Sequence, residues 1–242
     1  MTLKRLARKA VQFFGYDLIP LKNPAFDDQK ELLGRDAEII VDVGAAIGKT
    51  ATIYRQLFPR ARLYLLEPHP ALYKVLTHNI RNDPLAFPFN LAASDSEAKR
   101  ILTLNRSPYT SSLLPLAILK KQWLTHGEAD PKGTVEVSAT TLDQFCVQQS
   151  IQHIDVLKVD VQGGELLVFG GAAGLLSSGR ISIIYAEVSL VEIYAGQPLL
   201  HDVLVFLDRF GYRLHNLYDL AVKMKTGRLM WGDALFVKAV EK

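Results

Sequence analysis

The sequence of 242 residues predicts an α/β fold, a doubly wound and mostly parallel sheet of seven strands with helices on both faces. Strand-like apolar runs alternate with helical stretches along most of the chain, as in strand–helix–strand units. The runs EIIVDV (38–43) and IDVLKVD (154–160) are nearly continuously apolar, which is typical of strands buried on both faces. The last two runs, YRLHNL (212–217) and DALFVKA (233–239), predict an antiparallel pair that ends the chain.

The first half of the sheet follows from apolar runs and prolines. A helix is expected over 48–57, before Pro59, and a second strand over 62–67. The next helix should begin near Pro70, a good first-turn residue, and run to about Arg81. A third strand is expected over 86–92, where Pro88 indicates the edge of the sheet.

The second half begins with two added strands, 99–104 and 134–139, which we expect to pair with each other. Thr141 to Gln144 has the form of a capping box and should open a short helix. Four further elements complete the pattern: helices over 164–170 and 198–210, the latter closed by Gly211, and strands over 154–160 and 181–188.

Residues 105–133 form a long irregular connection with one short helix expected at 115–124. Connections of this length usually have a function, and this one should lie at one end of the sheet. We therefore expect an inserted lid, with a peripheral insertion as the alternative. Four of its side chains could contact a bound substrate, although ordinary packing within the lid is the favoured role of each: Tyr109, Ser111, Ser112 and Trp123.

Composition restricts the class of protein. The 28 basic and 25 acidic residues give a net charge of +3, which does not indicate a nucleic-acid partner. Cys146 is the only cysteine, so there is no internal disulfide and no multi-cysteine metal site, and a reducing, cytoplasmic location is expected. The histidines show no metal-ligand spacing, and no metal is expected. No apolar run approaches the roughly 20 residues of a membrane span.

Residues 1–35 are expected to be an N-terminal amphipathic helix and a linker, ahead of one domain at 36–242. Leu3, Leu6 and Phe13 fall close to one helical face, with Lys4 and Arg8 largely opposite. Such a helix either packs on the main domain or makes a weak contact with a membrane surface. We favour packing, because basic amphipathic helices are common.

The glycine loop VDVGAAIGKT (41–50) allows three interpretations. A phosphate-binding P-loop needs four residues between its glycines, but only three separate Gly44 from Gly48. The dinucleotide fingerprint G-x-G-x-x-G fails at Ala46. The third pattern is Asp42-x-Gly44-x-Ala46-x-Gly48, the loop of class I methyltransferases with its middle glycine replaced. Its glycines permit close backbone approach, and an acidic group favours the ammonium and sulfonium charges of S-adenosylmethionine.

The second strand ends in Glu67, whose carboxylate can accept hydrogen bonds from both hydroxyls of a ribose. This supports an adenosine ligand, and the loop selects the cofactor. Pro68 and His69 follow, and we expect His69 to face solvent. Adenine contacts are expected after the third strand, where Ser94 or Asp95 would bond the amino group unless they cap a helix. The segment concerned is Ala92, Ala93, Ser94 and Asp95.

The chain resembles the FkbM family of methyltransferases over roughly residues 36–240. The resemblance rests on six motifs in order: VDVGAAIGKT, LLEPHP, NLAASD, SATTLDQF, IDVLKVDVQGGE and IIYAEV. It implies a Rossmann-like fold and S-adenosylmethionine-dependent O-methylation of a hydroxyl on a sugar, glycolipid or secondary metabolite. The family usually carries Glu where this chain has Gln162, so no carboxylate role is assigned there.

Three charged residues lie at the carboxyl ends of the fourth and fifth core strands, where open α/β sheets place their sites. They are Lys158 and Asp160 on one strand and Glu187 on the next. Asp160 is either a general base or the structural ion-pair partner of Lys158, because residues two apart on a strand share a face. Gly163 and Gly164 either let the backbone approach a ligand or form a simple turn.

Two other functions stay open. The departure at Gln162 is compatible with a methyltransferase-like domain that binds a cofactor or partner without turnover. A nicotinamide-dependent oxidoreductase is disfavoured by the missing dinucleotide fingerprint. The leading hypothesis is a methyltransferase with a small-molecule or glycan acceptor, of a kind and oligomeric state that the sequence does not give.

Overall fold

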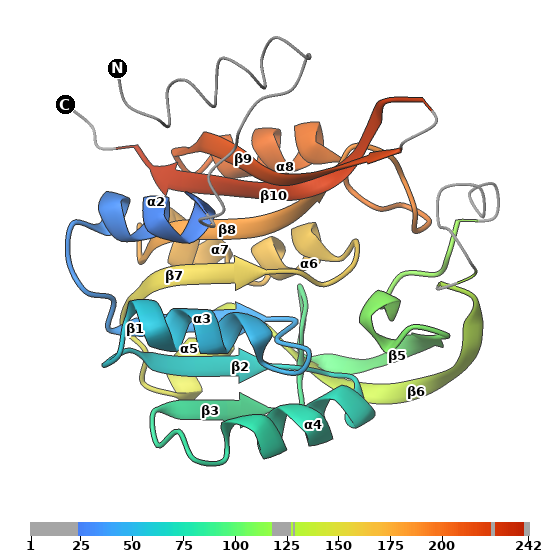
Figure 1. The fold of residues 1–242 in the computed structure, drawn as a ribbon, viewed down its shortest axis with the longest axis horizontal. Coiled ribbons are helices and arrows are strands. Elements are labelled where there is room, and N and C mark those ends of the chain that lie inside the picture. The colour runs from blue at the N-terminus through green and yellow to red at the C-terminus, as the bar shows by residue number, and fades with distance from the viewer. Residues whose placement is uncertain (1–23, 118–126, 128, 224–225, 240–242) are drawn as a thin grey trace, which may run out of the picture.

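The computed structural model describes residues 24–117, 127, 129–223 and 226–239 (Figure 1). Most of the expected N-terminal helix, residues 1–23, lies outside these ranges, and so do residues 118–126 of the connection. Residues 24–33, which the sequence suggested to be linker, instead form helix α2 (Pro24–Leu33). The helix belongs to the domain because Ala25 and Phe26 enter the core.

The main sheet has seven strands in the order β3-β2-β1-β7-β8-β10-β9. The first five in that order run parallel, and β10 lies antiparallel to both β8 and β9. The predicted mostly parallel sheet with an antiparallel C-terminal strand is confirmed. The strands are β1 (Ile39–Val43), β2 (Arg62–Leu66), β3 (Ala86–Phe89), β7 (Ile154–Val159), β8 (Ile181–Ser189), β9 (Tyr212–Lys223) and β10 (Arg228–Lys238).

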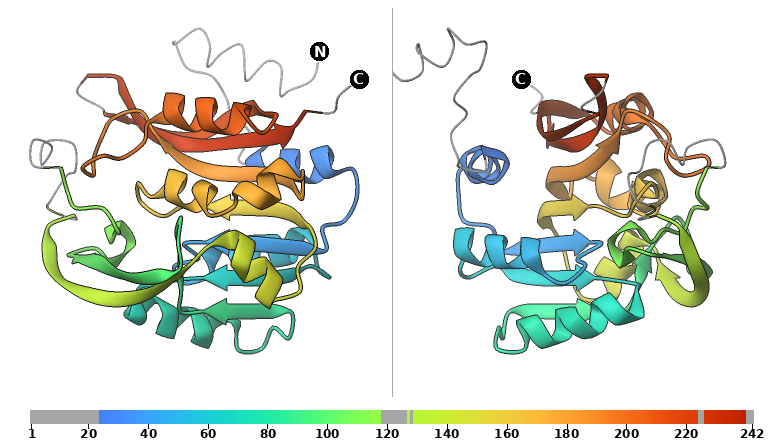
Figure 2. Two further views of the ribbon diagram at one scale, coloured as in Figure 1. Left: turned by 180° about the vertical axis from the view of Figure 1, so that it is seen from behind. Right: turned by 45° about the vertical axis from the view of Figure 1, so that its right-hand side comes forward.

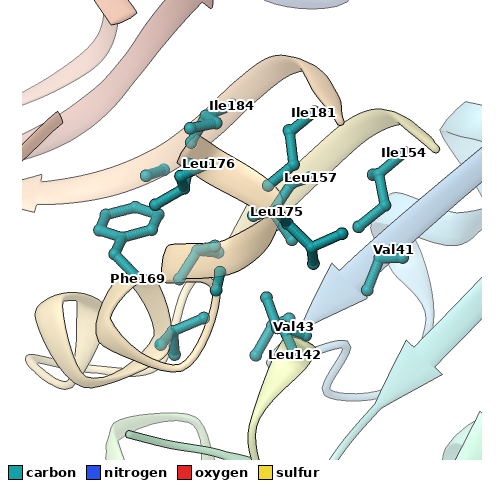
Figure 3. Close-up of a cluster of buried hydrophobic side chains, with 14 of the residues drawn as sticks. Val41, Val43, Leu142, Ile154, Leu157, Phe169, Leu175, Leu176, Ile181 and Ile184 are labelled. Atoms are coloured by element: carbon teal, nitrogen blue, oxygen red, sulfur yellow. The ribbon is translucent and has the colours of Figure 1, made fainter. Parts of the chain in front are cut away.

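Helices cover both faces of the sheet, as the two further views show (Figure 2). One buried cluster joins α2, α3 (Lys49–Leu57) and α4 (Pro70–Ile80) to the sheet through side chains such as Phe26, Tyr54 and Leu76. A second cluster lies on the opposite face (Figure 3). Its helices are α5 (Leu142–Gln148), α6 (Glu165–Gly170), α7 (Ala173–Ser177) and α8 (Leu200–Asp208).

Strand alternation decides which side chains reach which cluster. On β1, Val41 and Val43 enter the cluster of α5 to α8, whereas Ile40 enters the other one. Asp42, between the two valines, therefore points to the face covered by α2 and α3, where it is fully buried. A buried carboxylate on that face needs a partner of opposite charge, and Lys158 on the adjacent strand β7 supplies it.

A small second sheet lies beside the main one, with the strand order β4-β6-β5. It contains β4 (Ala92–Ala93), β5 (Ala98–Asn105) and β6 (Pro131–Thr140). The expected pairing of the two added strands is confirmed, since β5 and β6 are antiparallel. The expected strand 86–92 was too long: β3 ends at Phe89, because Asn90 donates through Nδ2 to the carbonyls of Glu67 and Pro68. Ala92 and Ala93 pair instead with β6.

The connection from β5 to β6 begins with a short 3₁₀ helix, η1 (Pro108–Thr110). The expectation of a helix at 115–124 is wrong for residues 115–117, the part of this range that the structure describes. There, Leu116 forms a β-bridge with Tyr194, and Ala117 N donates to Ile193 O. Two helix starts are confirmed: Thr141 caps α5 by accepting from Gln144 N, and Pro70 is the first residue of α4. No helix among the described residues is both long and apolar enough to cross a membrane.

Two adjacent glycines, Gly170 and Gly171, differ in the space that is available for a side chain. A Cβ at Gly171 would lie 2.0 Å from Ser94 O, whereas a Cβ at Gly170 would meet Asp95 Cβ at 3.6 Å, an ordinary contact. Gly171→Ala should therefore lower the free energy of unfolding by about 1–3 kcal/mol or more. Gly170→Ala, at the end of α6, should leave it unchanged or raise it by up to about 1 kcal/mol. Urea denaturation checks both, and equal stabilities would contradict the packing.

Candidate functional site

A cavity of about 210 Å³ opens at the carboxyl ends of β1, β2 and β7, beside the small sheet. Open α/β sheets place their ligands at this edge. The sequence-predicted residues that border it are Gly44, Ala46, Glu67, Pro68, Ala92, Ala93 and Asp160. Residues of the β5–β6 connection, including Tyr109 and Ser112, form the opposite side.

The glycine loop is held against both neighbouring strands. The backbone N–H groups of Gly44 and Ala45 donate to Leu66 O at 2.9 and 3.1 Å, at the end of β2. On the other side, a Cβ at Gly44 would lie only 1.8 Å from Asp160 O, and the φ of Gly44 is 83°. Glycine is therefore required at position 44 for two independent reasons. Ala46 also has a left-handed φ, 49°, in place of the glycine found in the common pattern.

Glu67 joins the glycine loop to the start of α4. Its Oε2 accepts from Ala46 N at 2.8 Å and its Oε1 accepts from His69 N at 2.7 Å. The residue is 5% exposed, and burial raises the pKa of its carboxyl to about 7 against the opposing effect of these two hydrogen bonds. Each oxygen keeps a lone pair, so Glu67 can still accept from a ligand.

His69 does not face solvent as expected. It is buried, borders the cavity and caps α4, where its Nδ1 accepts from Ala71 N and Leu72 N at 3.2 and 3.4 Å. Burial lowers the pKa of the imidazole. Neutral Nδ1 is an acceptor, so the cap requires an uncharged ring. The capping position directly before Pro70 was the sequence signal for this role.

The predicted adenine segment divides into two parts. Ala92 and Ala93 border the cavity together with Leu72, Leu91 and Leu102, which makes an apolar slot. Ser94 and Asp95 do not border it. Ser94 is fully buried, and its Oγ donates to Asp95 Oδ1 at 3.2 Å, while Asp95 pairs with Arg100 at 2.6 Å.

Lys158 lies between two carboxylates on the face covered by α2 and α3. Its Nζ is 3.4 Å from Asp42 Oδ1 and 3.2 Å from Asp160 Oδ2. Burial alone would lower the pKa of Lys158, but Asp160 and Asp42 outweigh that effect and raise it. Both Asp42 oxygens are buried without a hydrogen-bond partner, and burial raises the pKa of this carboxyl while Lys158 opposes the rise. Asp42 and Gly48 do not border the cavity.

Gln162 connects the two acidic candidates. Its Nε2 donates to Asp160 Oδ1 at 3.0 Å and to Glu187 Oε2 at 2.9 Å. Burial, followed by the charges of Asp160 and Glu165, raises the pKa of Glu187 well above its usual value. The sequence identified both carboxylates, but gave no signal that one amide would join them.

A second cavity, of about 210 Å³, begins on the other side of Gln162. Glu187 borders it, with Tyr194, Gln197 and Trp231. Trp231 reaches the cavity because β10 pairs with β8 in a register that sets Trp231 opposite Ser189, two residues beyond Glu187. Tyr109 and Gln162 border both cavities.

This arrangement suits transfer chemistry between two bound molecules. The first cavity can hold an adenosine-type cofactor beside Asp160, and the second can hold an acceptor beside Glu187. Within the described ranges, no three His, Cys, Asp or Glu side chains are grouped to hold a metal ion. Trp123, a candidate acceptor contact, lies outside those ranges.

Comparisons with known proteins show which family the chain resembles. The family model described as "Methyltransferase FkbM domain" matches residues 42–214. The "2-O-methyltransferase NoeI" of Sinorhizobium fredii is 27% identical over 188 residues, which are 74% of this chain and 74% of that protein. "Methyltransferase sdnD" of Sordaria araneosa is 29% identical over 153 residues, which are 54% of this chain and 59% of that protein.

Solved structures share the fold at low identity. A Galdieria sulphuraria protein described as a "putative sarcosine dimethylglycine methyltransferase" superposes with a TM-score of 0.50 at 10% identity, over 90% of this chain and 85% of that one. This likeness bears on the fold alone. Because the family model spans well over half of the chain, the protein belongs to the FkbM family of S-adenosylmethionine-dependent methyltransferases.

Proposed function

We propose that this methyltransferase acts on a hydroxyl group of a small polyhydroxylated acceptor, such as a sugar, bound in the second cavity. The observation that carries the proposal is the meeting of two cavities at Tyr109 and Gln162, one bordered by the glycine loop and Asp160 and one by Glu187 and Trp231. An aromatic side chain beside polar groups suits a ring with apolar faces and hydroxyl edges. A relative named as a 2-O-methyltransferase supports a hydroxyl acceptor.

The first cavity fits the cofactor on three grounds. Gly44 leaves the backbone open to close approach, and Glu67 presents a carboxylate that can accept from both ribose hydroxyls. The apolar slot at Leu72, Leu91 and Ala92 suits a flat base.

The cofactor supplies a methyl group that is already activated on a sulfonium, so the work of the chain is alignment and proton removal. We assign Asp160 as the general base, because it borders the first cavity and its side chain, which is 36% exposed, can be reached by a bound acceptor. Lys158 orients it through Oδ2, and Gln162 through Oδ1. Glu187 contributes a second negative group on the acceptor side.

We also infer that the β5–β6 connection acts as the lid. Tyr109 borders both cavities, and Ser112 Oγ donates to Gln162 O at 2.7 Å, which ties the connection to the turn after β7. A lid at this place separates the acceptor hydroxyl from bulk water.

The Glu67 carboxylate can be tested against a matched buried carboxylate. Glu165 also accepts two backbone N–H bonds, from Gly163 and Val161, and burial likewise raises its pKa to about 7, but it does not border the first cavity. Glu67→Gln and Glu165→Gln should both lower the melting temperature. Calorimetry should show that only Glu67→Gln weakens binding of S-adenosylhomocysteine, by about ten-fold or more. Equal affinities in the two variants would remove Glu67 from the cofactor site.

Asp160→Asn tests the general base. The variant keeps its shape but cannot take a proton, so methyl transfer should slow by roughly 10²–10⁴-fold while S-adenosylhomocysteine still binds. Stability should fall only in part, because Lys158 keeps Asp42 as a partner. The assay uses radiolabelled cofactor with a panel of sugar and polyketide acceptors, and Asp233→Asn is the control for loss of a buried carboxylate on the same face.

The outcomes separate the candidates. Full transfer by Asp160→Asn with loss in Glu187→Gln would move the base to Glu187. Tight cofactor binding without transfer to any acceptor on the panel would favour the alternative of a domain that binds without turnover.

A further inference from the structure

Gln162 occupies the boundary between the cavities in a backbone conformation that most side chains avoid. Its φ is 57°, and it is followed by Gly163 with a φ of 100°. A left-handed non-glycine residue is strained, and it persists where its surroundings impose this conformation. Such residues gather at functional sites.

The surrounding contacts fix both the backbone and the amide of Gln162. Ser112 Oγ donates to its carbonyl at 2.7 Å, and Glu165 Oε1 accepts from the next backbone N–H, that of Gly163, at 3.0 Å. The Tyr194 hydroxyl lies 3.3 Å from Gln162 Oε1 and donates at 2.7 Å to Thr110 O. The oxygen of the amide therefore faces Tyr194, and its NH₂ group faces the carboxylates.

The charges around this amide are mostly negative. Asp160 and Glu187 accept from it directly, and Glu165 and Asp233 add to the negative potential at Glu187. The positive group in the cluster is Lys158, which contacts Asp42 and Asp160. The tyrosine on the oxygen side is Tyr194. Two carboxylates so close together repel each other unless a donor lies between them.

We propose that Gln162 is a positioning residue of the transfer, whose NH₂ group holds the carboxyl groups of Asp160 and Glu187 in place at the boundary of the two cavities. An amide donates two hydrogen bonds at every pH in the working range. A carboxyl group at the same position would donate one bond when protonated and none when ionised. The chain thus has a permanent donor at a position where a carboxyl would act as a donor only at low pH.

The first test needs neither cofactor nor acceptor. Gln162→Met keeps the length of the side chain and removes both donors. In protein labelled with ¹³C at its carboxyl carbons, NMR titration should show the pKa of Glu187 rising by about one pH unit in this variant. The control is Gln197→Met, which removes a second amide of the same cavity that bonds to Ser189 and to two backbone N–H groups but to neither carboxylate. It should leave the Glu187 titration unchanged.

A second variant, Gln162→Glu, should make the melting temperature depend on pH, which would not happen if Gln162 only filled space. The pKa of the introduced carboxyl should be raised in the folded state by its two acidic neighbours. The contribution of this carboxyl to stability is then present below its pKa in the unfolded chain, about 4.3, and is lost as the pH rises through its pKa in the folded state. Melting temperatures of variant and wild type should therefore be close near pH 5 and diverge steadily toward pH 8.

The inference rests on the proposed function only for the use made of the two carboxylates. An unchanged Glu187 titration in Gln162→Met, an equal rise in Gln197→Met, or a pH-independent melting difference for Gln162→Glu would each overturn it. These readouts involve no turnover. Failure of the positioning role can therefore be distinguished from failure of Asp160→Asn to slow methyl transfer, which concerns the proposed function.

Discussion

The site depends on one close approach between backbones. The glycine loop after β1 passes so near the end of β7 that any side chain at Gly44 would collide with Asp160 O. The other edge of the loop is hydrogen-bonded to Leu66 O at the end of β2. Three adjacent parallel strands therefore end in one rigid corner, and the loop, Glu67 and Asp160 have little freedom to separate. A preorganised corner of this kind suits methyl transfer, in which alignment supplies much of the rate.

The charged residues of the same corner provide its chemistry, and their burial lowers the stability of the fold. Asp42, Asp160, Glu187 and Asp233 come from four strands, and Lys158 is the cation between the first two. Burial raises the pKa of Asp42, Glu187 and Asp233, so their ionised forms are held at a cost in stability. The acidic groups favour a cationic cofactor, and the amide of Gln162 and the ammonium of Lys158 limit their mutual repulsion. The loss of stability is balanced by the apolar clusters on both faces of the sheet.

Local signals in the sequence were sufficient for the sheet and for much of the first cavity. Continuous apolar runs identified β1 and β7, and the carboxylate at the end of β2 identified Glu67, because these features depend on neighbouring residues alone. The sequence did not predict the second cavity, since Trp231 reaches it through the register of β10 on β8. It also did not predict that Gln162 bridges Asp160 and Glu187. That contact requires the turn after β7 to lie against β8, where Glu187 is 25 residues further along the chain. Ser94 lies away from the cavity because the chain leaves the main sheet at Asn90, where a side chain ends the strand.

The most direct test of the account is a crystal structure of the protein with S-adenosylhomocysteine. We expect the ribose hydroxyls within hydrogen-bond distance of Glu67, roughly 2.6–3.2 Å, and the base in the slot beside Ala92. The sulfur should lie over the glycine loop and face Asp160, Gln162 and the second cavity. A nucleoside bound instead beside Trp231, or a sulfur directed away from Asp160, would contradict the assignment of the two cavities.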